Sequence, residues 1–454
     1  MNIPCEFIVR MEKFFNINNA ILTEYYNEKP YKGIRINTLK ANDNILIKLQ
    51  YDIKKTPFDI NSYYILSNES GLGKHPYYHA GAYYLQEPSA SSAVCAMNIQ
   101  PDEKILDLCA APGGKSTQIA AYLNEKGLLW SNEYVKNRTQ ALLSNIERMG
   151  IRNAVISSIH PDILCNKLQG YFDKVLVDAP CSGEGMFRKE PQAILNWSIE
   201  NINTCARRQL EILNSAAKAV KENGILVYST CTFAPEENEI CIDNFLTNNK
   251  DFELINCNLN FGRQGYTKFS DKYDMSLTRR ILPLDGGEGH FIAVMKRIAP
   301  NYCSIEGYNY KNSKKDNINK YNAEKLYNEL FGNKITGTLT IFQDKIRLLP
   351  YNLPDLTGLA VIKAGVDFAE IKNNRIEPCH GIYMSAKPDE IYNYINLSCD
   401  DKRIYAFLRG EQIDIDRCNN GYCAVLVDNI TVGFGKYSNG VLKNRYPKGL
   451  RNNI

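Results

Sequence analysis

The chain has 454 residues and a mass of 51.6 kDa, more than one hydrophobic core usually organises, so we expect roughly two to four domains. Hydrophobic residues make up 44% and charged residues 23%, which excludes a mainly disordered or collagen-like chain. The 54 Lys and Arg against 50 Asp and Glu give a net charge of only +4, so any polyanion partner must bind a local surface.

Fourteen cysteines and five histidines raise the question of disulfides and metals. The start, Met-Asn-Ile-Pro-Cys-Glu, lacks the sections of a signal peptide, so we expect reduced thiols and a cytoplasmic protein. No stretch approaches the ~18 apolar residues of a membrane-spanning helix. Cys418 and Cys423 do not have CxxC spacing and the histidines are scattered, so we predict no metal site.

The predicted elements begin with a small α+β region over residues 1–80, with strand-like segments at 33–38 and 63–67 among helical stretches. From about residue 102 to 297, short apolar runs alternate with amphipathic stretches, which is typical of a parallel sheet covered by helices. Strands are predicted at 104–109, 127–133, 153–159, 172–180 and 224–231. Helices are predicted at 116–124, 134–149 and 204–222, the last with a C-cap at Asn223-Gly224.

This pattern predicts an α/β domain with a doubly wound sheet, in which ligands bind outside the carboxyl ends of the strands. Residues 300–322 are polar and are predicted to form a linker. The sequence pattern does not indicate a fold for the middle region that follows. The surplus of positive charge lies beyond it, since residues 301–454 carry 21 basic and 17 acidic side chains. After Asp428 there is no acidic residue, and Tyr437 and Tyr446 alternate with five basic ones: Lys436, Lys443, Arg445, Lys448 and Arg451. This predicts a phosphate-contacting tail, with an ordinary solvated terminus as the alternative.

The first predicted strand runs into a turn of small residues that leads to a helix, and such a turn lets a ligand approach the backbone closely. The turn resembles a phosphate-binding P-loop, but Cys109 stands where that motif needs its first glycine. The second strand ends in Glu133, where a carboxylate can accept both hydroxyls of a ribose. A nucleoside ligand is therefore expected, although a surface Glu is an equally good interpretation of Glu133 alone.

Two cysteines follow neighbouring predicted strands. Cys181 lies just beyond Asp178 and before a glycine, and Cys231 ends the fifth strand. A buried structural cysteine is the ordinary interpretation of either one, but two together on the ligand-binding edge favour chemistry. The residues alone do not say which cysteine is the nucleophile.

Three motifs occur in one order: Asp107-Leu108-Cys109-Ala110-Ala111-Pro112-Gly113-Gly114-Lys115, Asp178-Ala179-Pro180-Cys181-Ser182-Gly183 and Ser229-Thr230-Cys231-Thr232. With these, the chain resembles the RNA 5-methylcytosine methyltransferases of the NOL1/NOP2/Sun family, and among them the bacterial RsmF-like ribosomal RNA enzymes. Residues 35–40, 83–89 and 284–289 extend the resemblance, and residues 433–436 and 442–451 look like the PUA-like module of RsmF relatives.

The resemblance implies a Rossmann-like methyltransferase domain at 81–298, between an N-terminal RNA-binding α+β domain at 1–80 and a linker and middle domain at 299–380, with a PUA-like RNA-binding domain at 381–454. It implies S-adenosyl-L-methionine as cofactor. The cofactor-binding residues are Cys109, Ala110, Ala111, Pro112, Gly113, Gly114, Lys115, Glu133, Arg138 and Asp178. His160 and Asp162 both stand near the expected adenine contact, and neither is assigned to the site.

By the same resemblance Cys231 is the nucleophile that attacks C6 of cytosine, and Cys181 assists release of the product. Because attack at C6 generates charge on the polar edge of the base, Asp178, with Lys115 as a candidate partner, is expected to hold that edge, or to protonate it if burial raises the pKa of its carboxyl. Arg188 and Lys189 are expected in a loop that lines the RNA entrance, with a solvated loop as the alternative.

The expected substrate is cytidine in small-subunit ribosomal RNA, naked or in the assembling subunit, bound by a monomer. A transfer RNA enzyme and a non-catalytic, RNA-binding assembly factor remain alternatives. A DNA methyltransferase needs only the Pro-Cys nucleophile, so the second cysteine and the PUA-like tail argue against DNA.

Overall fold

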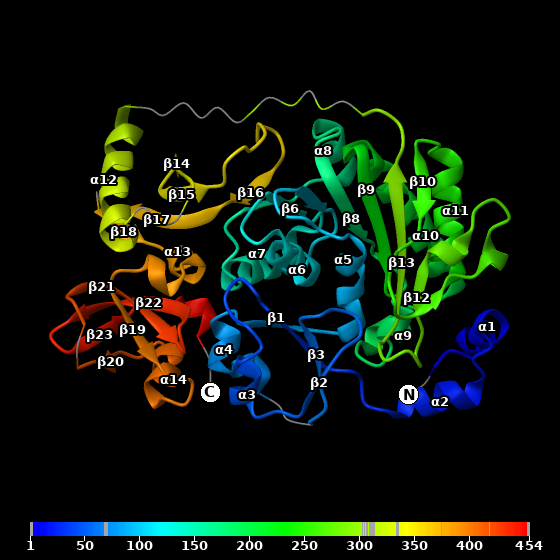
Figure 1. Cartoon of the computed structure of the whole chain (residues 1–454), viewed down its shortest axis with the longest axis horizontal. Coiled ribbons are helices and arrows are strands. Elements are labelled where there is room, and N and C mark those ends of the chain that lie inside the picture. Colours follow the sequence, from blue (N-terminus) through cyan, green and yellow to red (C-terminus); the bar gives the residue numbers. More distant parts are fainter. Residues whose placement is uncertain are drawn as a thin grey trace.

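The structure, a computed structural model, describes residues 3–67, 71–301, 303, 305, 307, 314–332, 336–373, 375–416 and 418–451. Its described strands form four sheets of four, ten, four and five strands. Figure 1 shows the large sheet with its helices on the right, the N-terminal sheet below its centre, and the two C-terminal sheets one above the other on the left.

The large sheet confirms the predicted doubly wound fold. Its parallel strands are β5 (Lys104–Asp107), β6 (Leu128–Asn132), β7 (Ala154–Ser157), β8 (Phe172–Asp178) and β9 (Val220–Thr230). They lie in the order β7-β6-β5-β8-β9, so the strand order reverses between β5 and β8. A crevice at such a reversal is where open α/β sheets bind ligands. Antiparallel strands extend the sheet beyond β9: β10 (Phe252–Ile255), β11 (Arg263–Gln264), β12 (Arg279–Ile281) and β13 (His290–Arg297).

Helices cover both faces of this sheet. One hydrophobic cluster includes Ile119 and Leu142, and a second includes Leu213 and Phe245. Since fully buried strands need an apolar layer on each face, the near-continuous apolar runs in the sequence follow from this arrangement. The helices are α5 (Ser92–Ala96), α6 (Gly114–Leu123), α7 (Thr139–Arg148), α8 (Pro161–Lys167), α9 (Pro191–Leu195), α10 (Ile199–Ala219) and α11 (Glu239–Asn248).

Several predicted element ends are corrected. Strands β5 and β8 stop at Asp107 and Asp178, so the motif residues beyond them are loop and not strand. The helix predicted over 204–222 starts earlier, because the Ser198 side chain accepts a hydrogen bond from the Asn201 backbone N–H. It ends at Ala219, because Val220 already pairs with Phe172 on the neighbouring strand.

The N-terminal region packs against the large sheet through its first helices and carries its own sheet in the order β2-β3-β1-β4. Phe7 and Met11 share a hydrophobic cluster with Phe187 and Phe233 of the sheet-end loops. The elements are α1 (Cys5–Phe15), α2 (Asn19–Asn27), β1 (Gly33–Ile36), α3 (Ile45–Leu49), β2 (Ile53–Lys55), β3 (Ser62–Ile65), α4 (Pro76–His79) and β4 (Tyr83–Gln86).

The linker predicted over 300–322 falls partly outside the described residues, and its second half is corrected to helix. Helix α12 (Lys314–Phe331) buries Ala323, Tyr327, Leu330 and Phe331 on one face. Its polar first turns hid this spacing. The sheet β14-β15-β17-β18 lies beside it, while β16 pairs with β7 and covers that edge of the large sheet. The elements are β14 (Thr338–Phe342), β15 (Lys345–Leu349), β16 (Val361–Ala364), β17 (Val366–Lys372), β18 (Arg375–Pro378) and α13 (His380–Ser385).

The last sheet has the order β19-β21-β22-β23-β20. Lys436 and Lys443 are exposed on neighbouring strands and face each other in the register. Tyr437 and Tyr446, expected to alternate with the basic residues in a phosphate-contacting tail, are buried in the core at 7% and 3% exposure. The elements are β19 (Tyr394–Leu397), α14 (Lys402–Arg409), β20 (Ile413–Asp414), β21 (Gly421–Val427), β22 (Ile430–Ser438) and β23 (Val441–Asn444).

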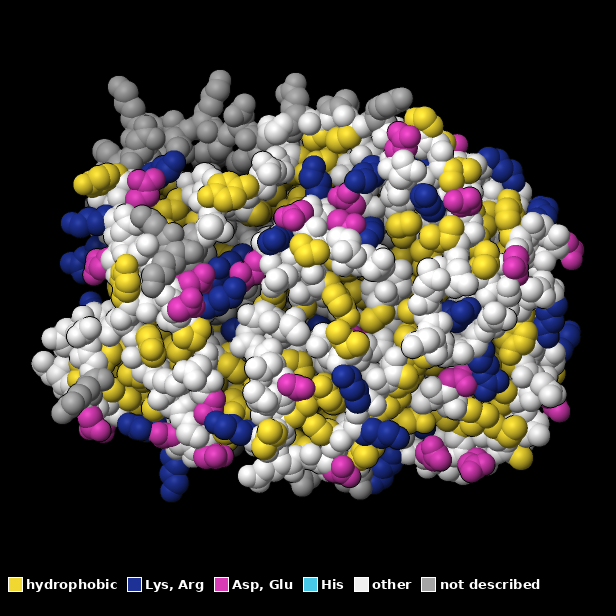
Figure 2. All heavy atoms as spheres, viewed as in Figure 1, with side chains coloured by type: hydrophobic (Ala, Val, Ile, Leu, Met, Phe, Trp, Pro, Cys, Tyr) yellow, Lys and Arg dark blue, Asp and Glu magenta, His cyan; other side chains and the backbone are white. Residues whose placement is uncertain are grey.

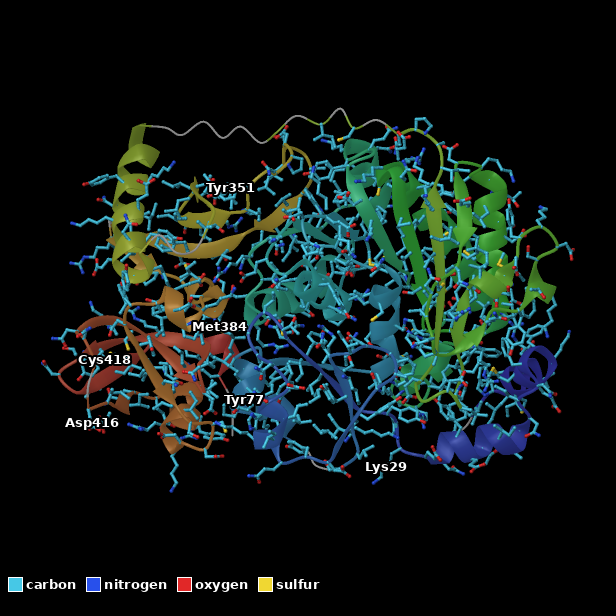
Figure 3. All side chains as sticks on the ribbon, in the orientation of Figure 1. Lys29, Tyr77, Tyr351, Met384, Asp416 and Cys418 are labelled. Atoms are coloured by element: carbon cyan, nitrogen blue, oxygen red, sulfur yellow. The ribbon has the colours of Figure 1, made fainter. Side chains whose placement is uncertain are left out.

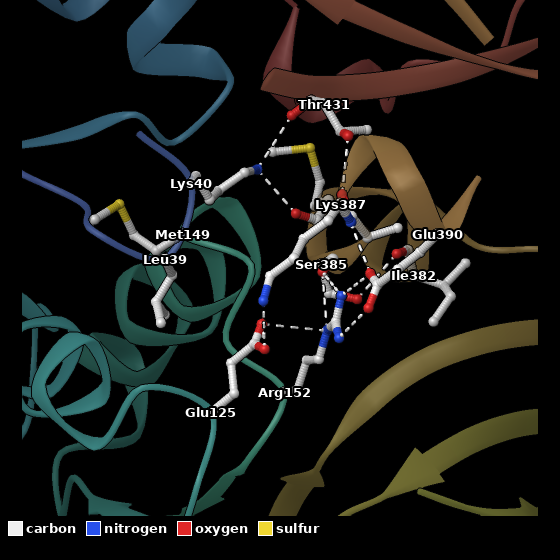
Figure 4. Close-up of polar contacts among 12 residues, drawn as sticks. Leu39, Lys40, Glu125, Met149, Arg152, Ile382, Ser385, Lys387, Glu390 and Thr431 are labelled. Atoms are coloured by element: carbon white, nitrogen blue, oxygen red, sulfur yellow. Dashed lines mark hydrogen bonds and ion pairs between the residues drawn. The ribbon is translucent and has the colours of Figure 1, made fainter. Parts of the chain in front are cut away.

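Charged contacts join the C-terminal sheets to the rest of the molecule (Figure 4). The Lys40 Nζ donates to the carbonyl oxygens of Met384, at 2.8 Å, and Thr431, at 3.1 Å. Arg152 forms an ion pair with Glu390. Burial and two nearby arginines lower the pKa of Lys40 from 10.5 to about 7. The N-terminal region is therefore tied to helix α13 and strand β22 by one largely desolvated amine.

Candidate active site

A cavity of about 600 Å³ opens at the strand-order reversal. It contains most of the residues that the sequence predicts for the site, with Gly113 and Glu133 as the exceptions. Its walls include the turn after β5, the loop after β8, the end of β9, strand β4 and helix α9. The predicted residues on them are Cys109, Ala110, Ala111, Pro112, Gly114, Lys115, Arg138, Asp178, Cys181 and Cys231.

The turn after β5 is held from behind by Glu133 and Arg138. The Ala111 N–H donates to a Glu133 carboxylate oxygen at 3.3 Å, and the Arg138 guanidinium donates to the Ala111 carbonyl at 2.8 Å. Glu133 is only 3% exposed, and its other oxygen accepts from the Val135 N–H at 2.8 Å. Gly113 has φ of 110°, a conformation that glycine adopts most readily, and a Cβ there would lie 3.3 Å from Leu142.

Asp107 is a cavity residue that the sequence reasoning did not select, although it begins the first motif. It is 1% exposed, and Ser116 donates to one of its oxygens at 2.6 Å. The other oxygen, Oδ1, is buried without a hydrogen-bond partner in the described part of the chain. Burial raises the pKa of Asp107 to about 7. An acceptor of this kind suits a ligand that carries an ammonium group.

The two predicted cysteines lie side by side. The Sγ atoms of Cys181 and Cys231 are 3.3 Å apart, because the residues that precede them, Asp178 and Ser229, are register partners on adjacent strands. The hydrogen bond between the Cys181 thiol and Cys231, together with burial, raises the pKa of Cys181 well above its usual value. Cys181 is therefore held as a neutral thiol next to Cys231 at the cavity wall.

Asp178 is surrounded by groups that favour its ionised form. Burial opposes ionisation, but the positive charge of Lys115 and the hydrogen bonds from Lys115 and Ser229 outweigh it and hold the pKa of the Asp178 carboxyl below its ordinary value. The Lys115 Nζ is 2.8 Å from Oδ2, and the Ser229 hydroxyl donates to Oδ1 at 2.7 Å. Asp178 is therefore a carboxylate that can accept hydrogen bonds from a ligand in the cavity.

Two buried glutamates hold the loops that carry the cysteines, and the sequence reasoning selected neither. Glu237 accepts from the Ser182 N–H at 2.9 Å and from the Ser182 hydroxyl. Glu184 accepts from the Thr232 hydroxyl at 2.9 Å and from the Trp197 indole at 2.8 Å. Each carboxylate thus joins a residue next to one cysteine to a separate element of the fold.

Some expected contacts are not made. Arg188, predicted at the RNA entrance, is 8% exposed and pairs with the buried Glu288 at 2.8 Å. His160 accepts from the Asp162 N–H at the start of α8, and Asp162 pairs with Lys218 at 2.7 Å. Neither His160 nor Asp162 lines the cavity. Among the described residues, no three His, Cys, Asp or Glu side chains gather as a metal site would require, and no helix has the length and apolar character to cross a membrane.

The sheet, the small-residue turn and the paired cysteines define a methyltransferase of the Rossmann-like class, and comparison with known proteins specifies the family. Residues 94–296 match the family described as 16S rRNA methyltransferase RsmB/F. Three further matches are specific to RsmF: its N-terminal domain at 3–88, its first C-terminal domain at 324–385 and its PUA domain at 394–452. The chain belongs to this family of methyltransferases, which confirms the resemblance drawn from the motifs.

Individual relatives agree. The chain is 30% identical to "Ribosomal RNA small subunit methyltransferase F" of Vibrio vulnificus (strain YJ016), over 94% of this chain and 92% of that one. It is 34% identical to "25S rRNA (cytosine-C(5))-methyltransferase nop2" of Schizosaccharomyces pombe, over 68% of this chain and 53% of that one. Among solved structures, a methyltransferase homolog from Pyrococcus horikoshii is 28% identical with a TM-score of 0.57, over 64% of this chain and 94% of that one.

Proposed function

We propose that this protein transfers a methyl group from S-adenosyl-L-methionine to C5 of a cytidine in small-subunit ribosomal RNA. The observation that carries the proposal is the pair of sulfur atoms 3.3 Å apart, on the wall of the cavity that also contains the turn after β5. What supports the ribosomal substrate is that the family match covers all four regions of the chain.

The cavity suits S-adenosyl-L-methionine, which supplies an electrophilic methyl group when bound. The turn from Cys109 to Lys115 is built from small residues, so a ligand can lie against its backbone. We assign the unpartnered Asp107 Oδ1 as the acceptor for the ammonium group of the donor. Glu133 supports the turn, and its contact with the ribose hydroxyls stays a prediction.

Cytosine C5 is a poor nucleophile until a thiolate adds to C6. In the proposed reaction Cys231 forms the S–C6 bond, and the electron pair displaced from the C5–C6 double bond makes C5 nucleophilic. Asp178 holds the polar edge of the base through its unoccupied acceptor positions. After C5 gains the methyl group, its proton leaves to a base, the double bond re-forms and the Cys231 thiolate departs. Cys181 assists this release.

The test compares Cys231→Ser and Cys181→Ser by denaturing gel after incubation with target RNA and donor. Cys231→Ser is expected to abolish methylation without an adduct, while Cys181→Ser accumulates a covalent RNA adduct. Cys5→Ser changes an exposed cysteine and serves as the matched control. An active Cys231 variant, or an adduct confined to it, contradicts the assignment.

Bisulfite sequencing of RNA from cells with and without the gene tests the substrate. Loss of signal at small-subunit cytidines is expected. Loss confined to transfer RNA overturns the ribosomal assignment, and loss at no cytidine overturns the function. We further propose a cytoplasmic monomer that acts on RNA and not on DNA.

A groove in the N-terminal region supports contact with RNA there. It has a volume of about 410 Å³ and is lined by Tyr31 and Tyr64 together with the basic residues Lys29, Lys32 and Lys54. No acidic residue lines it in the described part of the chain. Lys29 lies at the lower edge of the molecule in Figure 3, and Figure 2 shows charges of both signs over the rest of this face. Aromatic rings beside lysines suit a single strand of nucleic acid.

The groove is joined to the active site through one loop. The Tyr64 hydroxyl donates to the Gly286 carbonyl at 2.7 Å, and this loop continues to His290 on the cavity wall. The variant Lys32→Ala/Lys54→Ala is expected to bind RNA more weakly and to lower the salt dependence of log K by about 1.4, twice the single-strand value per phosphate. Lys250→Ala, at another exposed lysine, is the control. An unchanged salt slope contradicts a role for this groove.

A further inference from the structure

His290 is a buried imidazole at the active site to which the proposed reaction gives no role. It begins β13, which runs antiparallel to β9 with Phe291 opposite Thr230, so the fold places its side chain near Cys231. It is 3% exposed and lines the same cavity as the cysteines. A buried polar side chain on a ligand cavity calls for a partner.

The ring nitrogens of His290 have distinct roles. Nδ1 lies 3.1 Å from the Gly289 carbonyl oxygen, and because a carbonyl only accepts, Nδ1 carries the proton. Burial and the nearby Lys115 lower the pKa of His290 to about 4, so the ring is neutral at pH 7. Nε2 is then an acceptor, and it is buried without a hydrogen-bond partner in the described part of the chain.

A second acceptor lies close by. The Asp178 Oδ1 is 4.0 Å from the His290 Nε2, too far for a direct hydrogen bond. Oδ1 accepts from Ser229, but a carboxylate oxygen has two lone-pair positions, so one position remains. Two acceptors 4.0 Å apart can be bridged by one nitrogen that carries two hydrogens.

The distances fit such a bridge. A nitrogen about 2.9 Å from both acceptors subtends an angle of about 90° between them, against about 120° between the two N–H bonds of a planar amine. Each hydrogen bond is therefore bent to about 160°, within the favourable range above about 150°. Uracil has a carbonyl oxygen where cytosine has its exocyclic amine, and that oxygen would face two acceptors.

We propose that Asp178 and His290 together bind the exocyclic amine of the target cytosine, so that His290 is a specificity-determining residue. The proposal rests on the proposed function, because it requires that the cavity receive a cytosine. The alternative role of His290 is as a packing surface for the base, which its ring provides whatever its nitrogens do.

The test separates the nitrogen from the ring. His290→Phe keeps an aromatic ring and removes the acceptor, whereas His290→Gln offers an acceptor without the ring. Binding is measured in the Cys231→Ser background, so that no covalent bond forms, with two oligoribonucleotides. One contains the cytidine identified by bisulfite sequencing, and the other has pyrimidin-2-one, which lacks the exocyclic amine, at that position.

With His290 present, the cytidine RNA is expected to bind at least about tenfold more tightly than the pyrimidin-2-one RNA. The analogue has no amine, so it leaves the two acceptors of the site without a hydrogen-bond donor. His290→Phe is expected to remove about tenfold of this preference, and His290→Gln to restore part of it. Unchanged affinity for S-adenosyl-L-methionine in each variant shows that the cavity is intact.

Equal weakening of both RNAs by His290→Phe assigns only packing to the ring and overturns the proposal, as does an unchanged preference. Failure of the proposed function is distinguishable, because it appears earlier, as the absence of any cytidine whose methylation depends on the gene.

Discussion

Substitution of Glu237 tests whether a single buried carboxyl group holds the loop that carries Cys181. Glu237 is 0% exposed and binds three donors: the Ser182 N–H and the Gln209 side-chain amide on Oε1, and the Ser182 hydroxyl on Oε2. Glu237→Ala removes all three contacts. The Gln209 amide keeps its hydrogen bond to the Pro180 carbonyl at 3.0 Å, and the Ser182 hydroxyl keeps its hydrogen bond with the Thr232 hydroxyl at 2.7 Å.

The loss of stability in Glu237→Ala therefore depends on the Ser182 N–H, which is left without a hydrogen-bond partner, and on the space left by the carboxyl group. An unpaired buried donor costs about 1–3 kcal/mol, and the cavity adds about 1–2 kcal/mol. We expect Glu237→Ala to lower the free energy of unfolding by about 2–5 kcal/mol and to slow methylation, because residue 182 directly follows Cys181.

Glu237→Gln is the matched control. The amide oxygen can accept from both N–H donors, and the amide nitrogen faces only the Ser182 hydroxyl, which can accept as well as donate. We expect a cost below about 1 kcal/mol. Urea unfolding followed by circular dichroism measures both variants. If the Gln variant is as unstable as the Ala variant, or the Ala variant is as stable as the wild type, the reasoning about this carboxyl is wrong.

Burial also raises the pKa of Glu237 from 4.5 to about 7, so its ionisation disfavours folding. Between these pH values the folded state binds more protons than the unfolded state, and the stability from this group falls as the pH rises. Glu237→Gln does not titrate. The difference in stability between wild type and Glu237→Gln is therefore expected to shift against the wild type from pH 4.5 to about 7, and a difference independent of pH contradicts the assignment.

Three further predictions follow from buried charges. Lys40 has its pKa lowered from 10.5 to about 7, so the unfolded state binds more protons in this window and stability rises with pH; Lys40→Met should reduce that rise in urea unfolding at several pH values. Arg188→Ala leaves Glu288 buried without its cation and should cost about 3–5 kcal/mol in the same assay, whereas a cost below about 1 kcal/mol contradicts the ion pair. Donor affinity, measured by calorimetry, should fall as the pH drops below about 7 because Asp107 becomes protonated, and Asp107→Asn should bind the donor about tenfold more weakly with a flatter pH profile.

The five parallel strands could be predicted from the sequence, because strands that are buried on both faces consist of nearly continuous runs of apolar residues. The ends of β5 and β8 could not, because Leu108 and Ala179 continue the apolar character after the strand has stopped. Helix α12 was missed for the opposite reason. Its first turns are polar in sequence, and among its described side chains the first buried one is Ala323.

The motif residues of the site could also be predicted, because each follows directly from a strand end at the reversal of strand order. Arg188 shows where this reasoning fails. A basic residue in a loop near the site reads as an RNA contact, but Glu288 lies 100 positions away in the sequence and holds it in the interior. Glu184 and Glu237 were not selected from the sequence for the same reason, because their hydrogen-bond partners lie on other loops.

The register of antiparallel strands explains why His290 could not be selected. Its place beside Cys231 depends on Phe291 pairing with Thr230 across about sixty intervening residues, and no local pattern specifies that pairing. Asp107 and His290 each keep one buried acceptor without a partner, and both line the cavity. An unpaired buried acceptor destabilises the free protein by about 1–3 kcal/mol, so a ligand that supplies the missing hydrogen atom removes that cost on binding. Binding of S-adenosyl-L-methionine is therefore expected to raise the melting temperature. The rise should be smaller in Asp107→Asn, which binds this ligand about tenfold more weakly, and unchanged in His290→Phe.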